Sequence, residues 1–163
     1  MLGAGLLHTL GKSCRLVTPG GQLPRHTSKG TVMADWIDTQ ITTKLSPRSV
    51  GDTVARLTGI LSAKGIKVFA VIDQREQACQ AGLELRETTL VIFGNPATGT
   101  PVMDAAPLAA LDLPLKVLIW DDAGQAKVSY FSPAAIGERY GLSHDLAARL
   151  AGTDPLTDAL VAP

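Results

Sequence analysis

The stretch of residues 88–107, TTLVIFGNPATGTPVMDAAP, is the feature of this chain that most constrains its fold. A continuous apolar run ends at Gly94, a loop rich in Gly, Asn and Thr follows, and a new segment starts at Thr100-Pro101. This pattern is typical of a buried strand that leads to a helix N-terminus, where backbone N–H groups often bind anions and small polar ligands. We therefore expect a buried sheet with a helix at the end of one strand.

Length and composition indicate a globular domain. The chain has 163 residues, of which 45% are hydrophobic and 18% charged, so it can bury a full core. The formal net charge of zero argues against nucleic-acid binding through bulk electrostatics. The longest apolar run, 113–120, is interrupted by Pro114 and Lys116 and is too short for a membrane helix. The two cysteines, Cys14 and Cys79, fit a reducing compartment, so we expect a cytoplasmic protein.

The first 33 residues differ from the remainder of the chain. They contain four basic residues and no acid, and Asp35 is the first acidic residue. This segment resembles a targeting peptide, or it lies upstream of a natural start at Met33. In both cases we expect residues 1–33 to be a basic, disordered or loosely docked extension and residues 34–163 to be a single domain.

Apolar periodicity and turn residues predict the elements of the first part of the domain. A helix is expected to start at the cap Ser46-Pro47 and to end before Gly65, with Val50, Val54, Leu57, Ile60 and Leu61 forming its apolar stripe. A second helix is expected to start at Thr100-Pro101 and to end before Pro107. Strands are predicted over 37–43, 67–72 and 83–93, and a short helix over 73–81.

The second part of the domain contains a strong hairpin signal. Residues 115–120 and 127–131 flank the turn sequence Asp121-Asp122-Ala123-Gly124. Ser132-Pro133 opens another helix, and Ser143 and Asp154-Pro155 can open two more. Together these elements predict an α+β fold with a mostly antiparallel sheet of about five strands, covered by helices on one face.

These residues resemble a known family. The segments LVIFGNPATGTPVMDAAP, LDLPLKVLIWDD and VSYFSP are similar to the DUF302 family over roughly residues 41–142. The resemblance implies a compact α+β domain grouped with TBP-like folds, which often forms a homodimer, and it implies no activity. One position departs from the family pattern, because Gln74 follows Asp73 where the family commonly has a histidine. A role that needs an imidazole there is not expected in this chain.

Polar residues follow two neighbouring strands of the predicted sheet. If the two strand ends lie side by side, these residues line one rim and can bind a small anion or polar metabolite. The alternative is that Gly94 and Gly99 only permit tight turns while Asn95 and Thr100 cap backbone groups. Lys116 and Tyr130 can join the rim if their side chains face it. The predicted ligand site consists of Asp73, Gln74, Asn95, Thr98, Gly99 and Thr100.

Other chemistry is poorly supplied. The Gly94 to Thr100 spacing resembles a phosphate-binding loop but lacks the lysine that reaches the phosphates. His144 and Cys79 belong to no metal-ligand pattern, so neither a metal nor a cofactor is expected. Asp121 and Asp122 are interpreted as turn residues rather than as a catalytic pair. The tryptophans, Trp36 and Trp120, are interpreted as core or interface anchors.

Three hypotheses for function remain open. The first is a small homodimeric binding or accessory protein that holds a small anion or metabolite at the rim, without nucleic-acid or membrane partners. The second is an interaction module in which the GNPATGTP segment is structural or forms a partner surface. The third is an enzyme that uses Asp73 or Asp104 as a general base, which requires that carboxylate to lie in a cleft.

Overall fold

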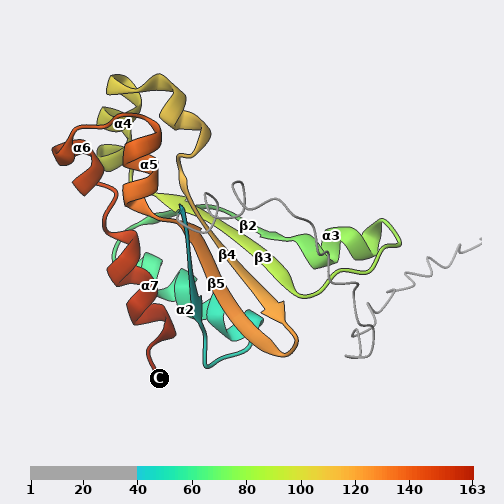
Figure 1. Ribbon diagram of the computed structural model, residues 1–163. Helices are drawn as coiled ribbons and strands as arrows, with labels where there is room; N and C mark the ends of the chain where they lie inside the picture. Colours follow the sequence, from blue (N-terminus) through green and yellow to red (C-terminus); the bar gives the residue numbers. More distant parts are fainter. Residues whose placement is uncertain (1–39) are drawn as a thin grey trace, which may run out of the picture.

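The computed structural model describes residues 40–163, and its centre is a five-stranded sheet (Figure 1). The strands lie in the order β1-β5-β4-β3-β2, and every neighbouring pair is antiparallel. This arrangement confirms the predicted α+β fold class. The strands are β1 (Ile41–Leu45), β2 (Lys67–Asp73), β3 (Thr88–Gly94), β4 (Leu115–Asp122) and β5 (Gln125–Phe131).

One face of the sheet is covered by two helices, α2 (Val50–Ala63) and α7 (Thr153–Val161). Alternate residues of β3 and β5 are buried, as expected for strands with one covered face. Side chains such as Val91, Ile119 and Val128 pack there against the apolar stripe of α2. The predicted stripe is thus confirmed as the part of α2 that faces the core.

A second group of helices lies at one end of the sheet (Figure 1). These helices enclose their own apolar cluster, which includes Val102, Ile136 and Leu150. Leu115, at the start of β4, packs against both this cluster and the main core. The helices are α4 (Pro96–Ala105), the 3₁₀ helix η1 (Pro107–Leu111), α5 (Pro133–Arg139) and α6 (His144–Ala148). A further short helix, α3 (Gln74–Gln80), follows β2 and contacts β3.

The predicted start of α2 at Ser46 is wrong. The helix begins three residues later, where the Ser49 hydroxyl accepts a hydrogen bond from the backbone N–H of Asp52. Ser46 still belongs to the sheet edge, since its backbone N–H donates to the carbonyl of Ala126. Its buried hydroxyl lies 2.8 Å from that of Thr53. The Ser-Pro pair therefore makes the turn that leads into the helix.

The predicted start of α4 at Thr100 is also wrong. Asn95 is the cap, its side-chain oxygen accepts from the N–H of Ala97, and Pro96 occupies the first turn. The chain contains two signals of the same kind, Asn95-Pro96 and Thr100-Pro101, and the first comes directly after β3 ends. The helix therefore starts there, and Pro101 lies inside it.

The hairpin and the later helices follow the predictions closely. Ala123 and Gly124 both have positive φ and form the turn between β4 and β5. Ser132 and Ser143 cap α5 and α6 as expected. The last helix starts at Thr153 with Gly152 as its cap, two residues before the expected cap Asp154. The predicted third strand begins only at Thr88. Three predictions lie outside the described residues: the start of the first strand at 37–39, the role of Trp36 and the 1–33 extension.

Candidate functional site

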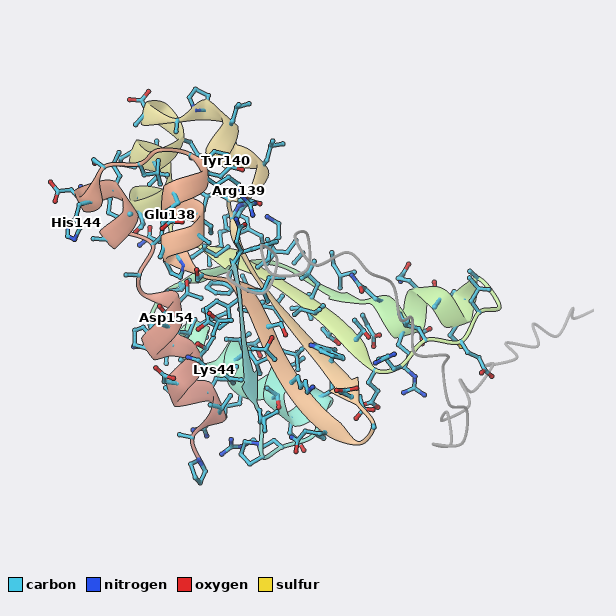
Figure 2. All side chains as sticks on the ribbon, viewed as in Figure 1. Lys44, Glu138, Arg139, Tyr140, His144 and Asp154 are labelled. Carbon is cyan, nitrogen blue, oxygen red and sulfur yellow. The ribbon has the colours of Figure 1, made fainter. Side chains whose placement is uncertain are left out.

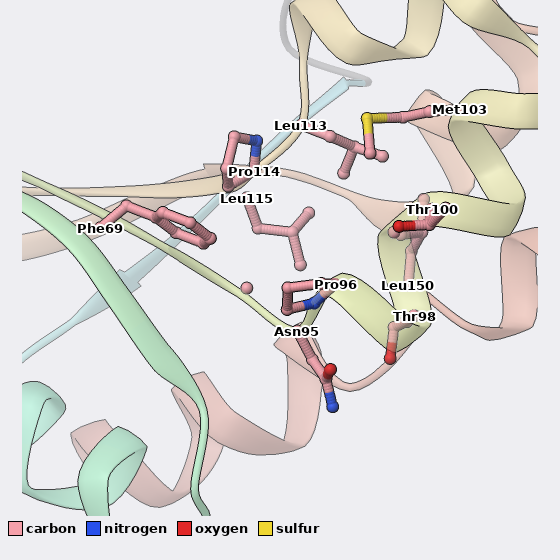
Figure 3. A pocket seen from close by; sticks show the side chains of 12 residues that line it. Phe69, Asn95, Pro96, Thr98, Thr100, Met103, Leu113, Pro114, Leu115 and Leu150 are labelled. Atoms are coloured by element: carbon pink, nitrogen blue, oxygen red, sulfur yellow. The ribbon is translucent and has the colours of Figure 1, made fainter.

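A cavity of about 260 Å³ lies between the end of the sheet and the N-terminal half of α4 (Figure 3). Phe69 of β2 forms one side of it, while Thr100 and Met103 of α4 lie on the other. The segment that enters β4 and one residue after α6 complete its walls. The lining residues are Phe69, Gly94, Asn95, Pro96, Thr98, Gly99, Thr100, Met103, Leu113, Pro114, Leu115 and Leu150.

Gly94 leaves space between two walls of the cavity because it has no side chain. A methyl group at this position would lie 3.5 Å from Cβ of Pro114 and 3.8 Å from the ring of Phe69, which is ordinary van der Waals contact. At Gly99, an added methyl group would lie 3.9 Å from the terminal carbon of Met103. Both glycines therefore leave open a space that a side chain would enter without a clash.

Four of the six predicted site residues lie at this cavity: Asn95, Thr98, Gly99 and Thr100. The proposed use of their backbone amides is nevertheless wrong. The N–H groups of Thr98 and Gly99 both donate to the carbonyl of Asn95, at 2.9 and 3.0 Å, because they belong to the first turn of α4. These donors are already occupied, so they do not form an anion-binding concavity.

The other two predicted residues, Asp73 and Gln74, lie at the opposite end of the sheet. The prediction placed the two strand ends side by side, which holds for parallel strands. Because β2 and β3 are antiparallel, Lys67 pairs with Gly94 and Asp73 pairs with Thr89. Asp73 is thus roughly 20 Å along β2 from Lys67, the partner of Gly94, at the usual rise per residue. The six residues do not form one rim.

The hypothesis of a general-base aspartate gains no support from the geometry. Asp73 is exposed and accepts a hydrogen bond from the N–H of Glu76 as the cap of α3. Asp104 is also exposed, and neither carboxylate lines the cavity. A solvated carboxylate has little reason to act as a base at neutral pH.

Lys116 and Tyr130 do not join the site. The Lys116 ammonium group donates to the carbonyls of Asp112 and Pro114, at 2.9 and 3.1 Å. Tyr130 points to the other face of the sheet, beneath α7, where its hydroxyl donates to Asp154 at 2.6 Å. Neither side chain lines the cavity: Tyr130 has its partner beneath α7, and the Lys116 ammonium group is held by backbone carbonyls, one of which belongs to the lining residue Pro114.

The remaining polar candidates also have structural surroundings. His144 is 97% exposed, and the described residues contain no group of three or more His, Cys, Asp or Glu side chains that could hold a metal ion. Asp121 accepts from the N–H of Gly124 in the hairpin turn, as interpreted, while Asp122 pairs with Lys127 at 2.6 Å. The hydrogen bond from Lys127 lowers the pKa of Asp122.

A polar network fastens α7 to the edge of the sheet (Figure 2). Lys44 of β1 donates to Asp158 at 2.7 Å and to Thr157 at 2.8 Å, and Tyr130 donates to Asp154. Burial, together with this hydrogen bond to Asp154, raises the pKa of Tyr130. Burial alone would lower the pKa of Lys44, but its bonds to the Asp158 and Tyr130 oxygens outweigh that effect and raise it. The network does not reach the cavity.

Sequence reasoning missed the apolar walls of the cavity. Phe69, Leu113 and Leu150 lie far apart in the chain and read as ordinary core positions. Trp120, interpreted from the sequence as a core or interface anchor, lies in neither apolar cluster, and its indole N–H donates to the Ser129 hydroxyl at 3.0 Å. Its pairing partner Thr88 and the alternation along β4 place it on the face away from α2.

Comparison with known proteins identifies the domain. The family described as "Domain of unknown function DUF302" matches residues 41–159. The chain belongs to the DUF302 family. The crystal structure of a conserved DUF302 protein from Bacillus stearothermophilus superimposes with a TM-score of 0.63 and 19% sequence identity, covering 74% of this chain and 94% of that one. This likeness shows that the two DUF302 proteins share a fold.

Two longer relatives carry a functional name. A protein called fluoride-specific ion channel FluC 1 from Brucella suis is 38% identical over 130 residues, which cover 77% of this DUF302 chain and 51% of that protein. A protein called FluC 2 from Brucella melitensis matches equally over 48% of its length. The chain thus spans about half the length of the curated relatives it matches. Within residues 40–163, no helix is long and apolar enough to cross a membrane.

Proposed function

We propose that this DUF302 domain is a small binding or accessory protein whose ligand occupies the cavity beside α4. The observation that carries the proposal is the cavity itself, which has a volume of about 260 Å³ and walls from four separate parts of the chain. Sites for small molecules are commonly concave, mostly apolar and equipped with a few polar groups. This cavity has those properties.

The position of the cavity in the fold supports the same function. It lies where the main core and the second apolar cluster meet, and Leu115 and Leu113 contribute to both the cavity and the clusters. A molecule bound there would contact the sheet and the helical end at once. Binding would therefore stabilise the packing of these two parts against each other.

A matched pair of variants tests the proposal. The double variant Gly94→Ala/Gly99→Ala adds two methyl groups to the cavity wall. The control, Gly51→Ala/Gly59→Ala, adds two methyl groups on α2 where no atom lies within 4 Å. The measurement is the ligand-induced rise in Tm over a panel of small molecules. A ligand at one hundred times its Kd stabilises the folded state by about 2.7 kcal/mol.

We expect compounds that stabilise the unmodified protein to lose most of that effect in the cavity variant and to keep it in the control. A Tm rise that persists in the cavity variant would place binding elsewhere on the molecule. A panel in which no compound raises the Tm of the unmodified protein would refute the binding function.

A second candidate function follows from the longer relatives. Proteins named as ion channels match this chain over only half their length, and residues 40–163 contain no membrane-crossing helix. A channel needs membrane-spanning segments, so these would belong to the unmatched half of the relatives. We propose that this domain is an accessory partner of such a membrane protein, as a separate chain or as part of a longer one.

Co-isolation tests this second function. The unmatched half of the Brucella suis relative would be expressed with a tag in membranes, together with residues 40–163 of the present protein. We expect the domain to be retained with the tagged membrane protein. The matched half of the B. suis protein, added in excess, should compete with the domain for that binding. Retention no greater than with an unrelated tagged membrane protein would exclude this role.

The homodimer implied by the family resemblance stays a prediction. Native mass spectrometry measures it directly, because a dimer has twice the 17.1 kDa mass of the chain. The same spectrum would show any small molecule retained from the producing cells.

A further inference from the structure

We infer that the cavity selects an uncharged, mainly hydrocarbon ligand with one ring or two fused rings. A single polar group of this ligand contacts the Thr100 hydroxyl. This inference rests on the proposed binding function and specifies the class of its ligand. It also replaces the anion expected from the sequence pattern.

The charge of the ligand follows from the walls of the cavity. None of the residues that line it carries a charged side chain. Its nearest candidate anion donors, the N–H groups of Thr98 and Gly99, already donate to the Asn95 carbonyl. An ion placed there would lose hydration, and the walls themselves offer it no charged side chain and no free set of backbone donors.

Two ammonium groups contact lining residues from neighbouring positions. That of Lys67 lies 4.9 Å from the centroid of the Phe69 ring, and that of Lys116 donates to the carbonyl of Pro114. The walls therefore favour an uncharged ligand, and they oppose a cation most strongly because two ammonium groups lie nearby.

The apolar character of the ligand follows from the same walls. Phe69 presents its ring from β2, Met103 lies across the cavity on α4, and Leu115 lies between them (Figure 3). A ring compound can contact the aromatic face on one side and the thioether on the other, and both contacts are favourable. Phe69 is 44% exposed, so a ligand against it also removes apolar surface from water.

The size of the ligand follows from the volume. An apolar cavity of roughly 150 Å³ in another protein binds benzene. The present cavity, at about 260 Å³, is larger and is open at one side. It therefore accommodates a fused two-ring molecule or a substituted single ring.

The polar contact is assigned to Thr100. Figure 3 shows its hydroxyl turned toward the space between Phe69 and Met103. No hydrogen bond of this hydroxyl to another of the described residues is present, and the residue is exposed, so a ligand group can replace a water molecule there. A hydroxyl or carbonyl group on the ligand would complete that bond.

Three related probes test the inference: naphthalene, 2-naphthol, which is neutral at pH 7, and 2-naphthoate, which is charged. Binding is measured by titration with ¹H–¹⁵N NMR, where the amides of Gly94, Gly99 and Leu115 report on the cavity. We expect 2-naphthol to bind at least about tenfold more tightly than 2-naphthoate, because the carboxylate loses hydration.

A substitution that keeps the shape of the side chain tests the polar contact. Thr100→Val should weaken 2-naphthol by about threefold to tenfold, the value of one hydrogen bond. It should leave naphthalene unchanged. Equal weakening of both compounds would show that the hydroxyl makes no specific contact and would overturn that assignment.

The remaining outcomes separate this inference from the proposed function. If 2-naphthoate shifts the cavity amides at the same concentration as 2-naphthol, the cavity binds ligands but does not select neutral ones, and only the inference fails. If none of the three probes shifts these amides, both the ligand class and the binding function lose their support.

Discussion

The Tyr130 hydroxyl links strand β5 to the last helix. It donates to the Asp154 carboxylate at 2.6 Å and accepts from the Thr157 hydroxyl at 3.1 Å, although the Tyr130 side chain is only 4% exposed. Both partners belong to α7. This hydroxyl group, together with the Lys44 ammonium group, joins the last helix to the sheet, so its removal should weaken the docking of a whole element.

Substitution Tyr130→Phe is expected to lower the free energy of unfolding by about 1.5–3 kcal/mol, the range for a hydrogen bond to a charged group. Urea denaturation measures this change. Tyr140→Phe is the matched control, since its hydroxyl also donates to a carboxylate, that of Asp112, from a less buried site. A loss for Tyr130→Phe no larger than that for the control would contradict the role of the network.

The raised pKa values of Tyr130 and Lys44 predict a loss of stability in alkaline solution. Their ordinary values are 10.0 and 10.5, and both are higher in the folded state. Above pH 10 the unfolded chain therefore releases protons first and binds fewer than the folded protein does. The stability contributed by these groups is complete below the ordinary values and is lost as the pH rises through the folded ones. Urea titrations between pH 8 and about 11 should show this decline, with a smaller decline in Tyr130→Phe.

At the level of elements, the β4–β5 hairpin contains a local conflict. Ala123 has a φ of 53°, a left-handed conformation that strains residues with a Cβ atom, while Gly124 at 89° is unstrained. Two-residue hairpin turns with both residues at positive φ favour Asn-Gly. The chain therefore has a turn residue that can be improved.

Substitution Ala123→Asn should raise the free energy of unfolding by about 0.5–1 kcal/mol, since asparagine tolerates this conformation better than alanine does. Gly124→Ala should lower it, because alanine is strained at that φ. Thermal denaturation of both variants measures the two effects. An unchanged or lower Tm for Ala123→Asn would show that the turn is not a point of strain.

Element types were more predictable from the sequence than helix starts were. The apolar stripe of α2 and the Asp-Asp-Ala-Gly turn have a local cause, so the sequence alone predicts them. The first residues of α2 and α4 depend on where the preceding strand stops pairing. Ser46 is held by Ala126 from a distant strand, and no local pattern reports that bond. The cap therefore shifts to Ser49.

For the whole molecule, the two apolar clusters should unfold together. Leu115 packs against both, and the cavity lies at their junction. Ile136→Ala, in the second cluster, is expected to lower the free energy of unfolding by about 2–4 kcal/mol through the lost contacts and the space left behind. In a Trp36→Phe background, Trp120 fluorescence reports on the sheet and circular dichroism on the helices.

We expect the two probes to give the same midpoint, shifted equally by Ile136→Ala, as cooperative unfolding requires. Helical signal lost at lower denaturant than the Trp120 signal would show that the helical end unfolds separately. In that case the cavity would lie between two independently stable parts.

The candidate site shows the limit of sequence reasoning at this scale. Asn95 to Thr100 were found because the strand-to-helix pattern is local. Their grouping with Asp73 required the relative direction of two strands, and this follows from how the whole sheet is connected. The apolar walls could not be predicted in this way. A cavity forms where side chains that are distant in sequence leave space between them, and no local pattern reports that packing.

The edge strand β1 can enter the sheet only after β5, its neighbour there, has been made. Its partner residues in β5 are far along the chain, with Thr43 and Ser129 separated by 86 positions. On a ribosome, β1 emerges before its neighbour in the sheet, β5, has been translated. Pairing the two strands closes a long segment of chain, which carries an entropic cost. Nascent chains arrested before residue 125 would consequently leave the backbone N–H and C=O groups of residues 41–45 without a strand partner, and such an unpaired edge can pair with another chain.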